Sequence, residues 1–132
     1  MRSQLGELQV LIVDDHADSA DALALLIETW GSGVQLARNA IDALKVAEAF
    51  APAVALIDLE MPKMDGYELA RRLRVLPHWK TVSMIAISGH GTDEHRRRSI
   101  ESGFEEHLVK PVPPEVLKRT LREIASRRSR ES

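Results

Sequence analysis

Five polar residues of this chain stand where an apolar run stops, and they are Asp14, Asp15, Asp58, Ser88 and Lys110. Three carboxylates brought together repel one another by about 4 kcal/mol per pair at ~4 Å and an effective dielectric of ~20, so such a cluster favours a cation. Oxygen ligands favour Mg²⁺, which keeps several waters, over zinc, which prefers His or Cys. A hard divalent ion beside an ammonium and a hydroxyl can hold a phosphoryl group, and a carboxylate can be the nucleophile that accepts it.

The elements that must position these residues alternate along the chain. Short apolar runs of strand length cover residues 8–13, 33–37, 53–57, 82–87 and 107–109. Apolar residues at helical spacing predict helices from Asp18 or Ser19 to Trp30 and over residues 40–50, 66–76, 92–102 and 114–127. Strict alternation of strands and helices predicts a parallel sheet with helices on both faces.

Turn and cap residues support these boundaries. Gly31 is expected to stop the first helix, and Asp65 with Glu68 three residues later resembles a capping box. Pro113 and Pro114 suit the first turn of the last helix. In a doubly wound sheet, ligands bind beyond the carboxyl ends of the strands, so the five polar residues are expected to meet at one rim.

Composition narrows the class of protein. A chain of 132 residues is large enough for one domain with its own core, and without cysteine it has neither disulfides nor a thiolate metal site. The net charge of −2 gives no overall attraction to nucleic acid. No apolar run approaches the roughly 20 residues of a membrane span, and no signal-peptide pattern opens the chain, so a cytoplasmic globular protein without a membrane segment is expected.

Four motifs carry a resemblance to a known family. They are VDD at 13–15, IDLEMPKMDG at 57–66, AIS at 86–88 and VKPV at 109–112, each at a predicted strand end. In this order they resemble the receiver domain of two-component response regulators. The resemblance implies a receiver domain over residues 8–126, an N-terminal extension at 1–7 and a basic C-terminal tail at 127–132. It also implies a flavodoxin-like (βα)5 fold with strand order 2-1-3-4-5.

The resemblance assigns roles to the acidic positions. Asp58 resembles the phosphoacceptor, Asp15 a direct Mg²⁺ ligand, and Asp14 a ligand acting partly through water. The backbone carbonyl of Glu60 should complete the share of the metal shell that the protein supplies, so the implied metal residues are Asp14, Asp15, Asp58 and Glu60. Pro62 and Gly66 match the family residues that shape the loop after the acceptor.

Further roles are implied at the fourth and fifth strands. Ser88 and Lys110 match the hydroxyl and the lysine that bind the phosphoryl group, and the Lys110–Pro111 bond is cis in the family. Glu60 and His90 match positions that tune hydrolysis of the phosphoryl group. Two residues depart from the family pattern: Gly89 replaces a small alanine, and His107 stands at the switch position that usually holds Tyr or Phe.

The implied function is signal relay rather than turnover of a substrate, so no enzyme activity is expected beyond self-assisted phosphoryl transfer and dephosphorylation. A histidine kinase or histidine phosphotransfer protein would donate a phosphoryl group to Asp58 with Mg²⁺, and Ser88 and His107 would switch the domain. A downstream protein would then bind the face made by residues 92–102, 107–109 and 114–127. A stand-alone protein and a segment of a hybrid histidine kinase both fit this sequence.

Other functions fit the sequence less well. A degenerate receiver that only binds proteins predicts loss of an acidic or lysine position, and every one is present. A Mg²⁺-dependent phosphatase needs a second acid in a D-x-D pattern, whereas the sequence here is DLE at 58–60. The basic segments 94–99 and 125–132 favour a solvated helix face and a frayed tail over nucleic-acid binding, and no DNA-binding domain is expected. The spacing of the five histidines does not favour a metal site.

Overall fold

The computed structural model describes residue 5 and residues 8–131. Within these residues the strands are β1 (Gln9–Val13), β2 (Gly33–Ala37), β3 (Val54–Asp58), β4 (Ser83–Ser88) and β5 (Glu106–Val109). The helices are α1 (Ala17–Thr29), α2 (Ala40–Ala49), α3 (Gly66–Arg74), α4 (Asp93–Glu101) and α5 (Pro114–Glu131), with a short 3-10 helix η1 (Pro77–Trp79) before β4.

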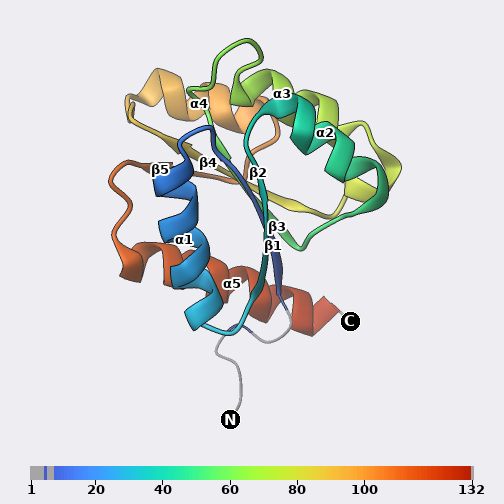
Figure 1. The fold of residues 1–132 in the computed structure, drawn as a ribbon, viewed down its shortest axis with the longest axis vertical. Helices are drawn as coiled ribbons and strands as arrows, with labels where there is room; N and C mark the ends of the chain where they lie inside the picture. Colours follow the sequence, from blue (N-terminus) through green and yellow to red (C-terminus); the bar gives the residue numbers. More distant parts are fainter. Residues whose placement is uncertain (1–4, 6–7, 132) are drawn as a thin grey trace.

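The described strands form one parallel sheet in the order β2-β1-β3-β4-β5, which confirms the predicted flavodoxin-like topology. Helices α1 and α5 cover one face of the sheet, and α2, α3 and α4 cover the other (Figure 1). The sheet is therefore buried on both faces, as the unbroken apolar runs predict.

Strand β3 shows how the sequence builds this core. All five of its residues are buried, and successive side chains point to opposite faces of the sheet. Ala55 and Ile57 pack in the cluster with α2 and α3, whereas Val54 and Leu56 pack in the cluster with α1 and α5. Asp58 ends the strand where these two apolar layers end, so its carboxylate reaches the rim of the sheet.

The loop after β3 depends on a glycine. A Cβ at Gly66 would lie 2.8 Å from both the Asp58 carbonyl oxygen and Leu59 Cα, which is too close for any side chain. Just before it, the Asp65 carboxylate accepts a 3.0 Å hydrogen bond from Glu68 N–H and caps α3, as the sequence predicts. Gly66 thus lets α3 begin directly against the end of β3.

Helix α1 begins earlier than the cap residues suggest. His16 is its N-cap, rather than Asp18 or Ser19, and both of these lie within the helix. The Asp14 carboxylate explains the early start, because its Oδ1 accepts a 2.9 Å hydrogen bond from His16 N–H and turns the chain there. At the other end Gly31 follows the helix with φ of 99°, as expected of a glycine stop.

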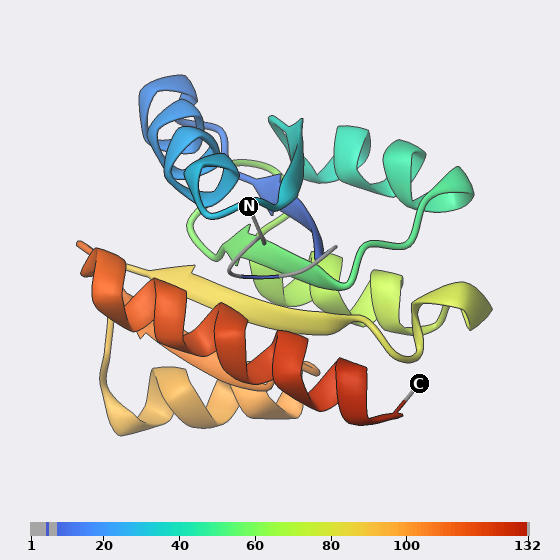
Figure 2. The same cartoon turned by 90° about the horizontal axis from the view of Figure 1, so that it is seen from below.

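The sequence predicts a frayed basic tail at the C-terminus, and this prediction is wrong for residues 127–131, which are helical. Helix α5 continues through the basic segment to Glu131 instead of fraying, and it lies in front of β4 in Figure 2. Arg127 explains the extra turn: its Nη2 donates to Ser83 Oγ at 3.2 Å and to Glu105 Oε2 at 2.7 Å. Residue 132 lies outside the described residues.

The N-terminal extension falls largely outside the described residues, which include only Leu5 of residues 1–7. Leu5 is buried in the cluster that α1 and α5 form against the sheet. The boundaries of the domain at residues 8 and 126 stay predictions. Among the described helices, none combines the length and the apolar character needed to cross a membrane.

Candidate functional site

Asp58 lies at the centre of the rim formed by the carboxyl ends of the strands. It is the last residue of β3, and only 2% of its surface is exposed. Its Oδ1 accepts a 3.0 Å hydrogen bond from Glu60 N–H and lies 3.2 Å from Lys110 Nζ. Its Oδ2 has no hydrogen-bond partner among the described residues. One oxygen of this buried carboxylate is therefore held in place, and the other is buried without a hydrogen bond.

Lys110 reaches Asp58 from the loop after β5. Its backbone N–H donates to the Ser88 carbonyl oxygen at 2.7 Å, and the peptide bond to Pro111 is cis, which confirms the expectation for this bond. The side chain is partly exposed and forms an ion pair with the acceptor oxygen. Lys110 is thus the cation of the site that the sequence predicts.

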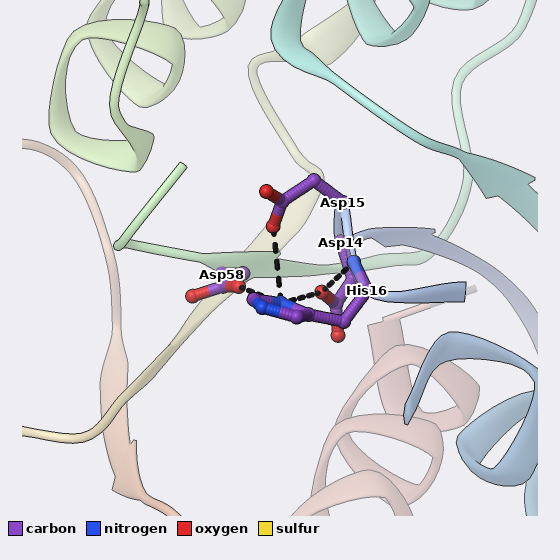
Figure 3. Close-up of side chains that lie close together, drawn as sticks. All are labelled: Asp14, Asp15, His16 and Asp58. Atoms are coloured by element: carbon purple, nitrogen blue, oxygen red, sulfur yellow. Dashed lines mark hydrogen bonds and ion pairs between the residues drawn. The ribbon is translucent and has the colours of Figure 1, made fainter. Parts of the chain in front are cut away.

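Asp14, Asp15 and Asp58 come together as predicted, and His16 joins them (Figure 3). One ligand atom from each of these four residues lies within 4.8 Å of the others. His16 Nδ1 lies 3.3 Å from Asp14 Oδ1, 3.2 Å from Asp15 Oδ1 and 3.9 Å from Asp58 Oδ2. His16 was not among the predicted site residues, although its position directly after the aspartate pair is a signal that points to it.

Burial raises the pKa of Asp58 above its usual value, and the nearby charge of Asp14 adds to this. The hydrogen bond from Glu60 N–H and the charge of Lys110 act in the opposite direction but do not cancel the effect of burial. The ionised acceptor is therefore short of positive charge. A divalent cation would supply it.

Oxygen atoms suitable for such a cation converge at this point. Asp15 Oδ1, like Asp58 Oδ2, is buried without a hydrogen-bond partner in the described part of the chain. The receiver-like acidic cluster of Asp14, Asp15 and Asp58 could therefore hold a metal ion, and its donor set fits a hard divalent ion. The metal role of the Glu60 carbonyl stays a prediction.

In the described residues the Ser88 hydroxyl is hydrogen-bonded to the Glu60 side chain and not to Asp58. Ser88 Oγ donates to Glu60 Oε2 at 2.6 Å, and Gly89 N–H donates to Glu60 Oε1 at 2.7 Å. Burial by itself would raise the pKa of Glu60, but these two hydrogen bonds, with the charges of Lys110 and His90, bring it below its usual value. Glu60 therefore stays ionised and ties the end of β4 to the loop after β3.

His107 lies on β5, the strand that precedes Lys110. Although β5 is an edge strand, the ring is buried, with 6% of the residue exposed. Its Nδ1 lies 2.6 Å from Ser99 Oγ and its Nε2 lies 2.7 Å from the His90 carbonyl oxygen. Because a carbonyl only accepts, Nε2 carries the hydrogen in this pair. The ring thus connects α4 with the loop after β4.

Residues 10–122 match the family model described as the response regulator receiver domain. This chain belongs to that family. It is a receiver domain of the kind found in two-component signalling systems, and its fold and acidic rim are those that the motifs predict.

The chain is similar to a protein of about its own size and to one segment of a much larger kinase. The chain is 39% identical over 110 residues to an uncharacterized 14.6 kDa protein from Leptolyngbya boryana, covering 83% of this chain and 84% of that protein. It is 36% identical over 121 residues to the sensor histidine kinase RcsC of Salmonella typhimurium, covering 92% of this chain. The matched part spans only 13% of that kinase. The match to the kinase is thus confined to one segment of it.

Solved structures agree with the fold of this receiver. The chemotaxis protein CheY4 of Vibrio cholerae matches with a TM-score of 0.85 and 26% identity, covering 90% of this chain and 99% of that one. A CheY-like receiver domain protein from Methanospirillum hungatei matches with a TM-score of 0.87 and 27% identity, covering 96% and 100%.

Proposed function

We propose that this receiver takes a phosphoryl group from a phosphohistidine onto Asp58 and passes the signal on as a conformational change. The observation that carries the proposal is the state of Asp58: a buried carboxylate with one oxygen held by Lys110 and Glu60 N–H and the other without a hydrogen bond. The donor would be a histidine kinase or a histidine phosphotransfer protein.

The residues of the chain supply the groups that this transfer needs. A lone pair of the Asp58 carboxylate attacks the phosphorus, the P–N bond breaks, and its electrons return to the imidazole of the donor. Lys110 neutralises the charge that gathers on the phosphoryl oxygens. A bound Mg²⁺, held by Asp14, Asp15, Asp58 and the Glu60 carbonyl, would neutralise the remaining charge of those oxygens. Because the chain accepts the group rather than processing a substrate, we do not class it as a turnover enzyme.

The hydrogen bonds around His90 suggest how the signal leaves the site. His90 N–H donates to Ser88 Oγ at 3.0 Å, and the His90 carbonyl oxygen accepts from His107 Nε2. For Ser88 to donate to a phosphoryl group, its hydroxyl must leave Glu60, and this rearrangement alters its bond with His90. A shift of His90 then changes the support of the His107 ring.

This route differs from the one that the family pattern implies, in which the switch residue turns inward after phosphorylation. Here the ring of His107 is already inside, held by Ser99 on α4 and by the loop after β4. We therefore propose that Ser88 and His107 switch by exchanging hydrogen bonds, which alters the face made by α4, β5 and α5. A downstream protein would bind this face.

The acceptor is tested by incubation with acetyl phosphate and Mg²⁺ followed by intact-mass measurement. The wild type should gain one phosphoryl group, and Asp58→Asn should gain none. Asp18→Asn is the matched control, because Asp18 is an exposed acid in the first turn of α1 outside the cluster. Equal labelling of wild type and Asp58→Asn would overturn the proposal.

The switch is tested by NMR of the histidine rings with and without beryllofluoride, a phosphoryl mimic, in the presence of Mg²⁺. The ring signals of His107 should move, whereas those of His78 on η1, at the far end of the sheet, should not. An unchanged His107 ring in the loaded protein would remove it from the switch.

A further inference from the structure

We propose that His16 is a metal ligand, so that the acidic site gains a nitrogen donor and binds Mn²⁺ in preference to Mg²⁺. This deepens the proposed function, since it concerns the same carboxylates and adds the ion they select. Figure 3 shows the His16 ring directed into the space between Asp14, Asp15 and Asp58.

The separations between His16 Nδ1 and the carboxylate oxygens are those of ligands that share an ion. Two donors at ~2.1 Å from one ion lie about 3.0 Å apart at a right angle and about 4.2 Å apart on opposite sides. Nδ1 lies 3.2 Å from Asp15 Oδ1, 3.3 Å from Asp14 Oδ1 and 3.9 Å from Asp58 Oδ2, all within that range. The widest separation in the cluster is within 4.8 Å, so small movements close the set.

Two of the three oxygens that face His16 Nδ1 make no hydrogen bond among the described residues, whereas the third, Asp14 Oδ1, accepts one from His16 N–H. Asp58 Oδ2 and Asp15 Oδ1 are buried and have no hydrogen-bond partner in residues 5 and 8–131. The Asp58 carboxylate is almost wholly inaccessible, with 2% of its surface exposed. A buried carboxylate oxygen without a hydrogen bond is costly unless a cation meets it, so this atom points to a ligand independently of the number of acids nearby.

Both the backbone and the ring hold the imidazole beside the acidic cluster, because His16 Nδ1 also lies at hydrogen-bond distance, 3.3 Å, from Asp14 Oδ1. His16 N–H donates to Asp14 Oδ1 at 2.9 Å, and His16 is the N-cap of α1. N-cap side chains usually bond to the backbone of the first helical turn, but His16 makes no such bond. Its side chain is 63% exposed, so an ion can reach the ring from solvent. The side chain is therefore available to the acidic cluster.

The mixed donor set decides which ion fits. Mg²⁺ prefers oxygen atoms and gains little from an imidazole. Imidazole binds first-row transition ions well, and carboxylates suit Mn²⁺ as they suit Mg²⁺. Mn²⁺ can use both donor types of this site, so His16 adds to its affinity and leaves that of Mg²⁺ nearly unchanged.

The test compares the wild type with His16→Phe, which keeps a ring and removes the nitrogen, and with His78→Ala as a control. Electron paramagnetic resonance of Mn²⁺ gives the affinity, and electron spin echo modulation detects a ¹⁴N nucleus bonded to the ion. Losing even a residue that orients a ligand costs about 10–100-fold, so His16→Phe should weaken Mn²⁺ by at least about tenfold. Mg²⁺, measured by competition, should change by less than about twofold. The ¹⁴N signal should vanish in His16→Phe and persist in His78→Ala.

Absence of a ¹⁴N signal in the wild type would overturn the proposal. So would an equal loss of Mn²⁺ and Mg²⁺ affinity in His16→Phe, which would mark a structural role, or a gain for both ions, which would make the ring a competing cation. These measurements need no phosphodonor. A failure of this test therefore does not contradict phosphorylation of Asp58. In turn, a failure to phosphorylate Asp58 does not contradict metal binding by His16.

Discussion

Each end of the sheet holds a charged side chain that is at least partly buried, and the two ends treat that charge in opposite ways. At the amino end, burial lowers the pKa of Arg74, yet its guanidinium donates to four backbone carbonyl oxygens, those of Trp79, Lys80, Val82 and Gly103. At the carboxyl end, burial raises the pKa of Asp58, and one of its oxygens makes no hydrogen bond within the described residues. Hydrogen bonds thus satisfy the guanidinium of Arg74, whereas in the described part of the chain they satisfy only one oxygen of Asp58, beside an acidic cluster that could hold a metal ion. The amino end of the sheet thus contributes to stability, and the carboxyl end carries the candidate functional site.

The largest effect on stability is expected from removing the hydrogen bonds of Arg74 at the amino end of the sheet. Arg74→Met removes bonds at 2.9–3.2 Å that join η1, the start of β4 and the turn before β5, so it should lower the free energy of unfolding by about 2–3 kcal/mol. Arg72→Met on the same helix, where the side chain makes an exposed pair with Glu68, should cost less than about 0.5 kcal/mol. Urea unfolding measures both. Equal losses in the two variants would contradict the contrast.

The second-largest effect on stability is expected from adding Mg²⁺. Mg²⁺ at ten times its dissociation constant should stabilise the wild type by about 1.4 kcal/mol. Asp15→Asn should lose most of this gain, while Arg74→Met should keep it, because Arg74 lies at the other end of the sheet. Thermal unfolding with Mg²⁺ and with EDTA gives the comparison. A wild-type midpoint that ignores Mg²⁺ would count against the acidic cluster as a metal site.

Removing the unpaired charge should stabilise the protein when no metal is present. The pKa of Asp58 is higher in the folded than in the unfolded chain, so the folded state holds its proton to higher pH. Wild-type stability is therefore lost as pH rises from the unfolded value near 3.8 through the folded value, and Asp58→Asn avoids that loss. At neutral pH in EDTA the variant should therefore be more stable than the wild type.

Urea unfolding of wild type and Asp58→Asn across a pH series isolates this difference, with Asp18→Asn as the exposed control. The advantage of Asp58→Asn should disappear below the unfolded pKa. A variant that is less stable than the wild type at neutral pH would mean that Lys110 and Glu60 N–H already compensate the buried charge.

The smallest effect concerns the lifetime of the phosphoryl group. Glu60→Ala frees Ser88 Oγ and Gly89 N–H from their present acceptor, and His90→Ala changes the side chain beside them. Each should change the dephosphorylation rate by about threefold, or roughly 0.7 kcal/mol in the barrier, without changing the yield. Decay of the phosphorylated mass after removal of acetyl phosphate measures it. Unchanged rates in both variants would take Glu60 and His90 out of the mechanism.

Local patterns were enough to predict most of the fold. Short apolar runs and helical periodicity predicted each described strand and α-helix to within a few residues, and Asp65 and Gly31 marked boundaries as expected. The end of α5 could not be predicted, because its last turn depends on Arg127 bonding to Ser83, 44 residues earlier. The 3-10 helix η1 was also missed, since the apolar spacing continues to Leu76 although α3 stops at Arg74.

At the candidate site, too, some features could be predicted from the sequence and others could not. Strand ends predicted that Asp14, Asp15, Asp58 and Lys110 would meet, because the carboxyl ends of parallel strands share one edge. The sequence could not show that Glu60 holds Ser88, or that Ser99 and the His90 carbonyl bury His107, because those contacts depend on side-chain directions across separate elements. His16 was missed because its spacing to the other histidines carried no signal, whereas its neighbours in space are acids.

The central claim is that Asp58 forms the phosphoryl bond, and chemical trapping tests it most directly. The wild type would be phosphorylated by a phosphohistidine donor with Mg²⁺, reduced with borohydride, which converts an acyl phosphate to an alcohol, and mapped by peptide mass spectrometry. The account predicts reduction at Asp58 alone, with Asp14 and Asp15 in the same digest unmodified. Reduction at Asp14 or Asp15, or a phosphoryl group that resists borohydride because it sits on a histidine, would contradict it.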